Sequence, residues 1–203
     1  MDYDFTNDWF GGSGARNIWP VILKEWNPTK ILEIGSYEGA SATFVIESNF
    51  WSDIDLYCVD TWEGGIEHKQ ENTDMRSVEQ RFDRNIEIAK TRCRFGVNLT
   101  KKKGESAKEL VELLHEGHAS SFDLIYIDGS HTAADVLLDS LLSFKLLRVG
   151  GVMILDDYLW LSLNKKLLES PKIGIDAFTS THFDKIQILR MPIYQMFIKK
   201  LSE

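Results

Sequence analysis

Short apolar runs alternate with amphipathic stretches along most of the chain. Such runs are typical of strands buried on both faces of a parallel sheet, and a carboxylate stands at the end of four of them. The alternation of strand and helix predicts a doubly wound α/β sheet. The expected strands are Ile31–Ile34, Asp55–Asp60, a less regular run near Cys93–Leu99, Phe122–Asp128 and Val152–Leu155.

The amphipathic stretches place apolar residues at helical spacing. The expected helices are Ile18–Trp26, Ala40–Glu47, Val78–Lys90, Ala107–His115 and Ala133–Leu147. Asn27-Pro28 stops the first helix, and Ser106 is a suitable N-cap for the fourth. The glycines of Arg148–Gly151 are expected to close the last one as a C-cap, and Lys101–Lys103 to form a solvated edge.

The two ends of the chain carry weaker patterns. Residues 1–17 are expected to form a flexible lead-in or a flap in which Trp9 and Phe10 cover a ligand, and residues 18–203 to form one domain. Ser170–His182 reads as a loop. From Phe183 to Lys200, two strand-like runs flank Met191-Pro192 and predict an antiparallel hairpin.

Composition narrows the class of protein. A net charge of −8 argues against a broad surface for nucleic acid or an anionic membrane. No apolar run reaches membrane-spanning length, and the acidic start of the chain is unlike a signal peptide. Cys58 and Cys93 do not make a disulfide framework, so a reducing cytoplasm is the expected location. A homo-oligomer is compatible with this sequence.

The stretch from Glu33 to Ser41 joins the first strand to the next helix through a glycine turn. A turn of this kind presents backbone N–H groups to a ligand at the carboxyl edge of the sheet. A dinucleotide fingerprint would need glycines where Tyr37 and Ala40 stand. Glu33 would repel a pyrophosphate but suits a ligand with an ammonium group. The turn therefore favours S-adenosylmethionine over NAD.

The residues Glu33-Ile-Gly35-Ser-Tyr-Glu-Gly39 resemble motif I of class I S-adenosylmethionine-dependent methyltransferases. The resemblance implies a Rossmann-like, mostly parallel seven-stranded sheet that ends in an antiparallel hairpin. It assigns the methionine end of the cofactor to the glycine turn, the ribose hydroxyls to the second strand end and adenine to the start of a later helix. The implied cofactor-binding residues are Glu33, Gly35, Ser36, Gly39, Ser41, Asp60, Thr61, Trp62, Glu105, Ser106 and Asp128.

Acidic residues follow the fourth and fifth strands, at Asp128 and at the pair Asp156-Asp157. These stretches resemble the metal-binding stretches of small-molecule O-methyltransferases of the catechol and the macrolide- or aminocoumarin-sugar types. The resemblance implies Mg²⁺ bound by these three carboxylates and a small-molecule hydroxyl as acceptor. One departure is Asp157, where the catechol type has asparagine. His131 stands where that type has a catalytic lysine, so His131 and Asp128 are candidate catalytic residues. The competing interpretation of the aspartates is turn and cap chemistry.

The polar segment Trp62–Gln80 is a candidate lid with Trp62 and His68 as pocket residues. Two rival functions stay open at this level. One is an NAD(P)- or nucleotide-sugar-binding oxidoreductase, which the glycine pattern disfavours, and the other is a non-catalytic cofactor-binding protein. Methylation of protein or nucleic acid is disfavoured by the net charge and by the lack of a separate recognition domain.

Overall fold

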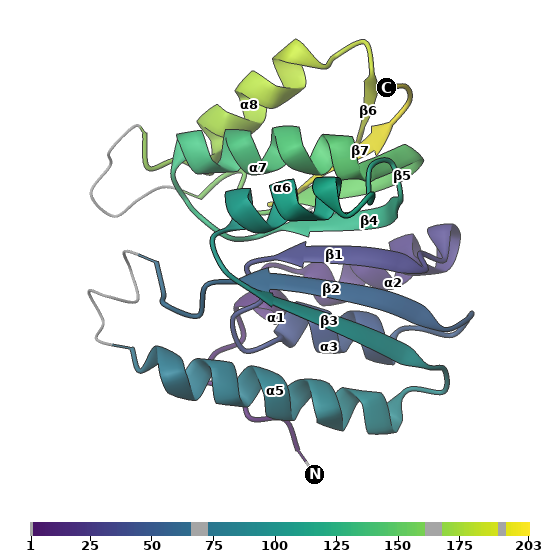
Figure 1. Ribbon diagram of the computed structural model, residues 1–203, viewed down its shortest axis with the longest axis vertical. Coiled ribbons are helices and arrows are strands. Elements are labelled where there is room, and N and C mark those ends of the chain that lie inside the picture. Colours follow the sequence, from purple (N-terminus) through teal and green to yellow (C-terminus); the bar gives the residue numbers. More distant parts are fainter. Residues whose placement is uncertain (1, 66–72, 161–167, 191–193) are drawn as a thin grey trace.

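The computed structural model describes residues 2–65, 73–160, 168–190 and 194–203, and these form a seven-stranded sheet between two layers of helices (Figure 1). The strand order is β3-β2-β1-β4-β5-β7-β6. β1 to β5 pair in parallel, and β7 runs antiparallel to both β5 and β6. The strands are β1 Lys30–Ile34, β2 Ile54–Asp60, β3 Val97–Lys103, β4 Phe122–Ile127, β5 Leu147–Leu155, β6 Ile186–Leu189 and β7 Met196–Lys200. The predicted Rossmann-like fold and its C-terminal hairpin are confirmed.

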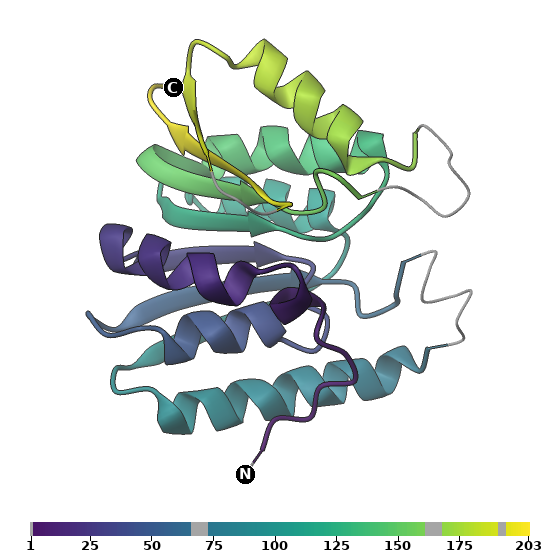
Figure 2. The ribbon, with the colours of Figure 1, turned by 180° about the vertical axis from the view of Figure 1, so that it is seen from behind.

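The helices divide between the two faces of the sheet. They are α1 Trp9–Gly12, α2 Ala15–Trp26, α3 Ala40–Glu47, α5 Met75–Arg92, α6 Ser106–His115, α7 Ala133–Leu146 and α8 Pro171–Thr181. α2, α3 and α5 pack on one face and α6, α7 and α8 on the other (Figures 1 and 2). The alternation of side chains along β1 explains this division. Ile31 packs in the core beneath α2, α3 and α5, whereas Leu32 and Ile34 pack in the core beneath α6, α7 and α8. Within the described residues, no helix is both long and apolar enough to span a membrane.

The segment Ser170–His182, expected to be a loop, contains helix α8, so that prediction is wrong. Pro171 occupies the first turn of the helix, where its missing N–H costs nothing. Ile175 and Phe178 are fully buried on one face, against the core that α7 also covers. Tertiary packing therefore stabilises a helix whose Gly, Ser and Thr residues give it a weak intrinsic propensity.

Two strand boundaries also differ from prediction. β5 begins at Leu147, so Arg148–Gly151 lie in a strand and do not form a helix C-cap. Leu147 pairs with Phe122 of β4, and this long-range pairing overrides the glycine signal. β3 covers 97–103 and not 93–99, which places the three lysines in the edge strand. There they pair with acidic residues of α5, of α6 and of its C-cap, for example Lys101 with Glu79, so they are not a simple solvated edge.

The N-terminal segment is tied to the rest of the domain. The Thr6 N–H and hydroxyl donate to the Glu38 carboxylate at 2.7 and 2.8 Å, and Arg81 pairs with the same carboxylate at 2.5 Å. Phe10 is buried against Trp19, so it packs in the core of the structure. The segment is thus anchored on the glycine turn, although whether it acts as a flap stays a prediction.

Candidate functional site

The carboxyl ends of the parallel strands β1 to β5 bring the predicted site residues to one edge of the sheet. The glycine turn after β1 is joined to both neighbouring strands: Gly35 N–H donates to Val59, and Asp128 N–H donates to Ile34, each at 2.8 Å. Gly35 has φ +85°, and a Cβ there would lie 2.0 Å from the Asp128 carbonyl oxygen. A glycine is therefore required at position 35 by this close approach as well as by its backbone conformation.

Asp60 holds the glycine turn in place. Its carboxylate accepts hydrogen bonds from the backbone N–H of Tyr37 at 2.8 Å and of Trp62 at 2.7 Å. The Trp62 indole N–H in turn donates to the Tyr37 carbonyl at 2.9 Å, and Trp62 packs on Phe82. Trp62 is only 3% exposed, so it belongs to the core. The neighbouring Thr61 hydroxyl accepts from the Glu63 N–H.

Glu33 lies buried beneath the turn. Its carboxylate accepts a hydrogen bond from the Ser41 hydroxyl, and the Cys58 thiol lies 3.6 Å from the second oxygen. Ser36 is buried beside it. Burial raises the pKa of Glu33 to about 7, and the hydrogen bond from Ser41 only partly offsets that cost. Within the part of the chain that the structure describes, the hydrogen-bond partners of this carboxylate are the neutral Ser41 and Cys58 side chains.

The predicted adenine residues stand at the start of α6. Glu105 is the N-cap residue and is exposed, so the predicted N-cap at Ser106 is wrong by one position. Ser106 lies near Asp139, a buried residue of α7; burial raises the pKa of Asp139 to about 6, and the Ser106 side chain partly offsets this rise. Sequence analysis missed Asp139. The available signal was a carboxylate among the inward-facing positions of an amphipathic helix.

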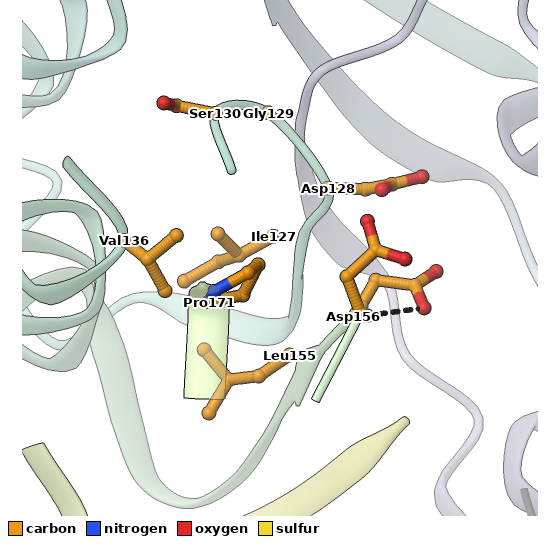
Figure 3. Close-up of a pocket in the computed structure, with 9 residues that line it drawn as sticks. Ile127, Asp128, Gly129, Ser130, Val136, Leu155, Asp156 and Pro171 are labelled. Carbon is orange, nitrogen blue, oxygen red and sulfur yellow. Dashed lines mark hydrogen bonds between the residues drawn. The ribbon is translucent and has the colours of Figure 1, made fainter. Parts of the chain in front are cut away.

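The three carboxylates after β4 and β5 come together at a small pocket whose lining includes Asp128, Asp156 and Asp157. Figure 3 shows the side chains of Asp128 and Asp156 next to each other at one side of the pocket, opposite Val136. Burial raises the pKa of Asp128 well above its usual range, and the charges of Asp156 and Asp157 raise it further. Burial followed by the Asp157 charge also raises the pKa of Asp156.

Two residues that sequence analysis did not select complete this cluster. The Tyr126 hydroxyl lies between two carboxylates, 2.8 Å from Asp128 and in a short hydrogen bond with Asp156. The Gln195 amide donates to the same oxygen of Asp156 at 2.8 Å. Tyr126 occupies an ordinary apolar position in its strand pattern, and Gln195 precedes a strand far along the chain. Neither residue carried a motif that could have revealed it.

His131 lies beside the acidic cluster. Its Nε2 is 2.8 Å from an Asp157 carboxylate oxygen, and its ring stacks on Trp160 with centroids 4.3 Å apart. The imidazole is therefore held in a defined orientation next to the predicted metal residues. His68, the other histidine selected from the sequence, lies outside the described residues, as does the middle of the predicted lid; residues 75–80 of that lid belong to α5.

The donor atoms of this cluster suit a divalent cation, but the side chains are not spaced as they would be around a bound one. Three carboxylates on neighbouring loops supply the oxygen ligands that Mg²⁺ prefers. Among the described residues, however, no group of three His, Cys, Asp or Glu side chains is arranged to hold a metal ion. The hydrogen bonds from Tyr126, Gln195 and His131 occupy several of these oxygens.

The family described as a methyltransferase domain matches residues 32–158, which is more than half of the chain. This protein therefore belongs to that methyltransferase-domain family, and the expected class I methyltransferase is confirmed. The match includes the glycine turn and ends at the residue after Asp157. No curated protein matches the chain.

Solved structures with this fold include O-methyltransferases. TomG from Streptomyces achromogenes, involved in tomaymycin synthesis and solved with SAM, is 16% identical with a TM-score of 0.66, over 93% of this chain and 80% of TomG. The O-methyltransferase of Bacillus cereus, solved with SAH, is 18% identical with a TM-score of 0.63, over 98% and 82% of the two chains. SAH-bound PaMTH1 from Podospora anserina is 16% identical with a TM-score of 0.63, over 93% and 78%. At these identities the likeness establishes the fold, and the roles of individual residues stay predictions.

Proposed function

We propose that this protein transfers a methyl group from S-adenosylmethionine to a hydroxyl oxygen of a small molecule. The observation that carries the proposal is the glycine turn of a methyltransferase-domain protein, bonded to Asp60 on one side and to the Asp128 loop on the other. Three carboxylates, Glu33, Asp60 and Asp128, surround that turn. The O-methyltransferases that share this fold support the hydroxyl acceptor.

In this proposal the cofactor supplies an electrophilic methyl group on a sulfonium, and the protein positions the two reactants for an in-line displacement. The glycine turn and Glu33 hold the methionine end, Asp60 the ribose hydroxyls, and Glu105 and Ser106 the adenine. His131, oriented by Asp157 at 2.8 Å, accepts the proton of the acceptor hydroxyl. Neutral imidazole is the form that can do so.

We further propose that Asp128, Asp156 and Asp157 hold Mg²⁺. The support is the convergence of three half-buried carboxylates: burial, and then the charges of Asp156 and Asp157, raise the pKa of Asp128. A divalent cation held by these carboxylates would relieve their repulsion and would supply Lewis acidity that lowers the pKa of the acceptor hydroxyl. Because the cofactor contacts lie mainly on the earlier strands, cation binding and cofactor binding are expected to be separable.

The cofactor site is tested by calorimetry with S-adenosylhomocysteine and the variant Asp60→Ala. Each charged hydrogen bond to the ribose is worth about 1.5–3 kcal/mol, so we expect affinity to fall at least about tenfold. Asp53→Ala is a matched control, because Asp53 also accepts a backbone N–H, from Gly96 at 2.7 Å, but at the opposite edge of the sheet. Parental affinity in a folded Asp60→Ala variant would refute this assignment.

The cation site is tested by titrating Mg²⁺ into the protein alone and by assaying methyl transfer with and without chelator. We expect Asp156→Asn to lose Mg²⁺ binding but to keep its affinity for S-adenosylhomocysteine. Asp184→Asn, an exposed aspartate after α8, serves as control. Full activity in excess chelator would remove the metal from the proposal and leave the methyl transfer intact. His131→Ala is expected to lower turnover without releasing Mg²⁺.

A further inference from the structure

Gln195 is a buried polar residue that lies against the acidic cluster. It directly precedes β7, and the antiparallel pairing of Met196 with Leu155 places it opposite Asp156. Its side-chain nitrogen Nε2 donates to Oδ2 of Asp156 at 2.8 Å, and the residue is 5% exposed. The C-terminal hairpin therefore contacts the predicted metal residues directly.

Trp19 of α2 determines how this amide is oriented. Its indole Nε1–H donates to Oε1 of Gln195 at 2.8 Å, across 176 residues of chain. An indole N–H can only donate, so the amide oxygen must face Trp19 and the amide NH₂ group must face Asp156. Trp19 is itself 1% exposed and packs edge-on against Tyr126 at 4.8 Å, so its position is well constrained.

The remaining bonds fix the plane of the Asp156 carboxylate. Oδ2 accepts from Gln195 and from the Tyr126 hydroxyl, and Oδ1 accepts from the Asp157 N–H at 2.7 Å. Tyr126 also reaches Asp128 at 2.8 Å, so these contacts place the two carboxylates relative to each other. Partners of this kind orient the ligands in metal sites generally.

We propose that Gln195, oriented by Trp19, is a positioning residue that presents Asp156 to a divalent cation together with Asp128. This inference rests on the cation site of the proposed function and extends it to two residues outside the matched family region. It assigns a functional role to α2, near the start of the chain, and to the C-terminal hairpin. The alternative is that the hydrogen-bonded chain only stabilises the fold, in which case its loss should not affect cation binding selectively.

The experiment measures the affinity of the full-length protein for Mn²⁺ by electron paramagnetic resonance and for S-adenosylhomocysteine by calorimetry, together with the urea midpoint. The variants are Gln195→Leu, Trp19→Phe and the double variant. The double variant removes both the Trp19 indole N–H and the Gln195 amide, so neither is left without its partner. Gln187→Leu, an exposed glutamine on β6 of the same hairpin, is the matched control.

Loss of such a partner typically costs about 10–100-fold in metal affinity, so we expect Gln195→Leu to weaken Mn²⁺ binding at least about tenfold. S-adenosylhomocysteine affinity should stay within about twofold of the parent, a change worth under about 0.5 kcal/mol. Trp19→Phe should show a smaller loss, because the amide is retained but can rotate. The double variant should bind Mn²⁺ no more weakly than Gln195→Leu, since both changes act through one chain.

Parental Mn²⁺ affinity in Gln195→Leu and in the double variant would overturn this inference and leave the proposed cation site standing. Equal losses of Mn²⁺ and S-adenosylhomocysteine binding with a lower urea midpoint would show a structural role and also overturn it. If the parent binds S-adenosylhomocysteine but no Mn²⁺, the cation site and this inference both fail, while the proposed cofactor remains. If Gln195→Leu does not fold, the Mn²⁺ and S-adenosylhomocysteine affinities of Trp19→Phe and of the double variant test the inference in its place.

Discussion

Two buried ionisable residues of this protein have opposite surroundings. Lys200 is fully buried but donates to the carbonyl oxygens of Phe144 and Leu147 at 2.9 and 2.8 Å, and to Glu203. Glu33 is almost as buried, yet among the described residues its carboxylate bonds only to the neutral Ser41 and Cys58 side chains. Hydrogen bonds within the fold thus offset the free-energy cost of burying the Lys200 charge. For Glu33 the cost of burying an ionised carboxylate remains, and a cationic group on a ligand would offset it.

At the residue scale, Glu33 predicts a pH dependence of stability. Its pKa is about 7 in the folded protein against 4.5 ordinarily, so the folded state binds the proton more tightly than the unfolded state. The stabilisation is complete below about pH 4.5 and is lost as pH rises through about 7, on the order of 3 kcal/mol in all. Glu33→Gln removes this titration.

We therefore expect the free energy of unfolding of Glu33→Gln, relative to the parent, to rise between pH 5 and pH 8.5. Urea denaturation at several pH values measures it, and taking the difference between the two proteins cancels other groups such as Asp139. A difference that does not change with pH would contradict the prediction.

At the scale of elements, α7 and α8 depend on a glycine for their close contact. A Cβ on Gly174 of α8 would lie 2.4 Å from the Ala133 carbonyl oxygen and 3.0 Å from the Leu137 nitrogen of α7. Both neighbours are backbone atoms, so neither can move aside by changing a rotamer. The small residue that weakens the helical pattern of α8 is therefore what allows α8 to pack.

Gly174→Ala should destabilise the protein by about 1–3 kcal/mol, because overpacking outweighs the gain in helix propensity of about 1 kcal/mol. The urea midpoint measures the change. Gly12→Ala is the matched control, since a Cβ at this helical glycine of α1 meets no atom within 4 Å. A Gly174→Ala variant as stable as the parent would show that the two helices can separate without cost.

At the scale of the whole molecule, cofactor binding should raise thermal stability. S-adenosylhomocysteine at about 100 times its Kd adds about 2.7 kcal/mol, which for a chain of this size corresponds to a rise in Tm of roughly 5–10 °C. Thermal unfolding with and without the ligand measures it, and Asp60→Ala should show a smaller rise at the same concentration. An unchanged parental Tm would count against the proposed cofactor.

Some features of this protein follow from the sequence because their physical causes are local. The strand of Ile31–Ile34, the turn with Gly35 and Gly39 and the helix of Ala40–Glu47 are all present where their periodicity and glycines predict them. Carboxylates at the ends of successive parallel strands must meet at one edge of the sheet. The sequence therefore determined the fold class and the edge at which the candidate site lies.

Only the tertiary structure decided how the site is supported, because those contacts join residues far apart in the chain. Trp19 meets Gln195 across 176 residues, and Gln195 meets Asp156 across 39. α8 and the start of β5 likewise depend on partners, α7 and Phe122, that no local pattern specifies. Local propensity sets which elements form, whereas long-range packing and buried hydrogen bonding set which side chains face the acidic cluster.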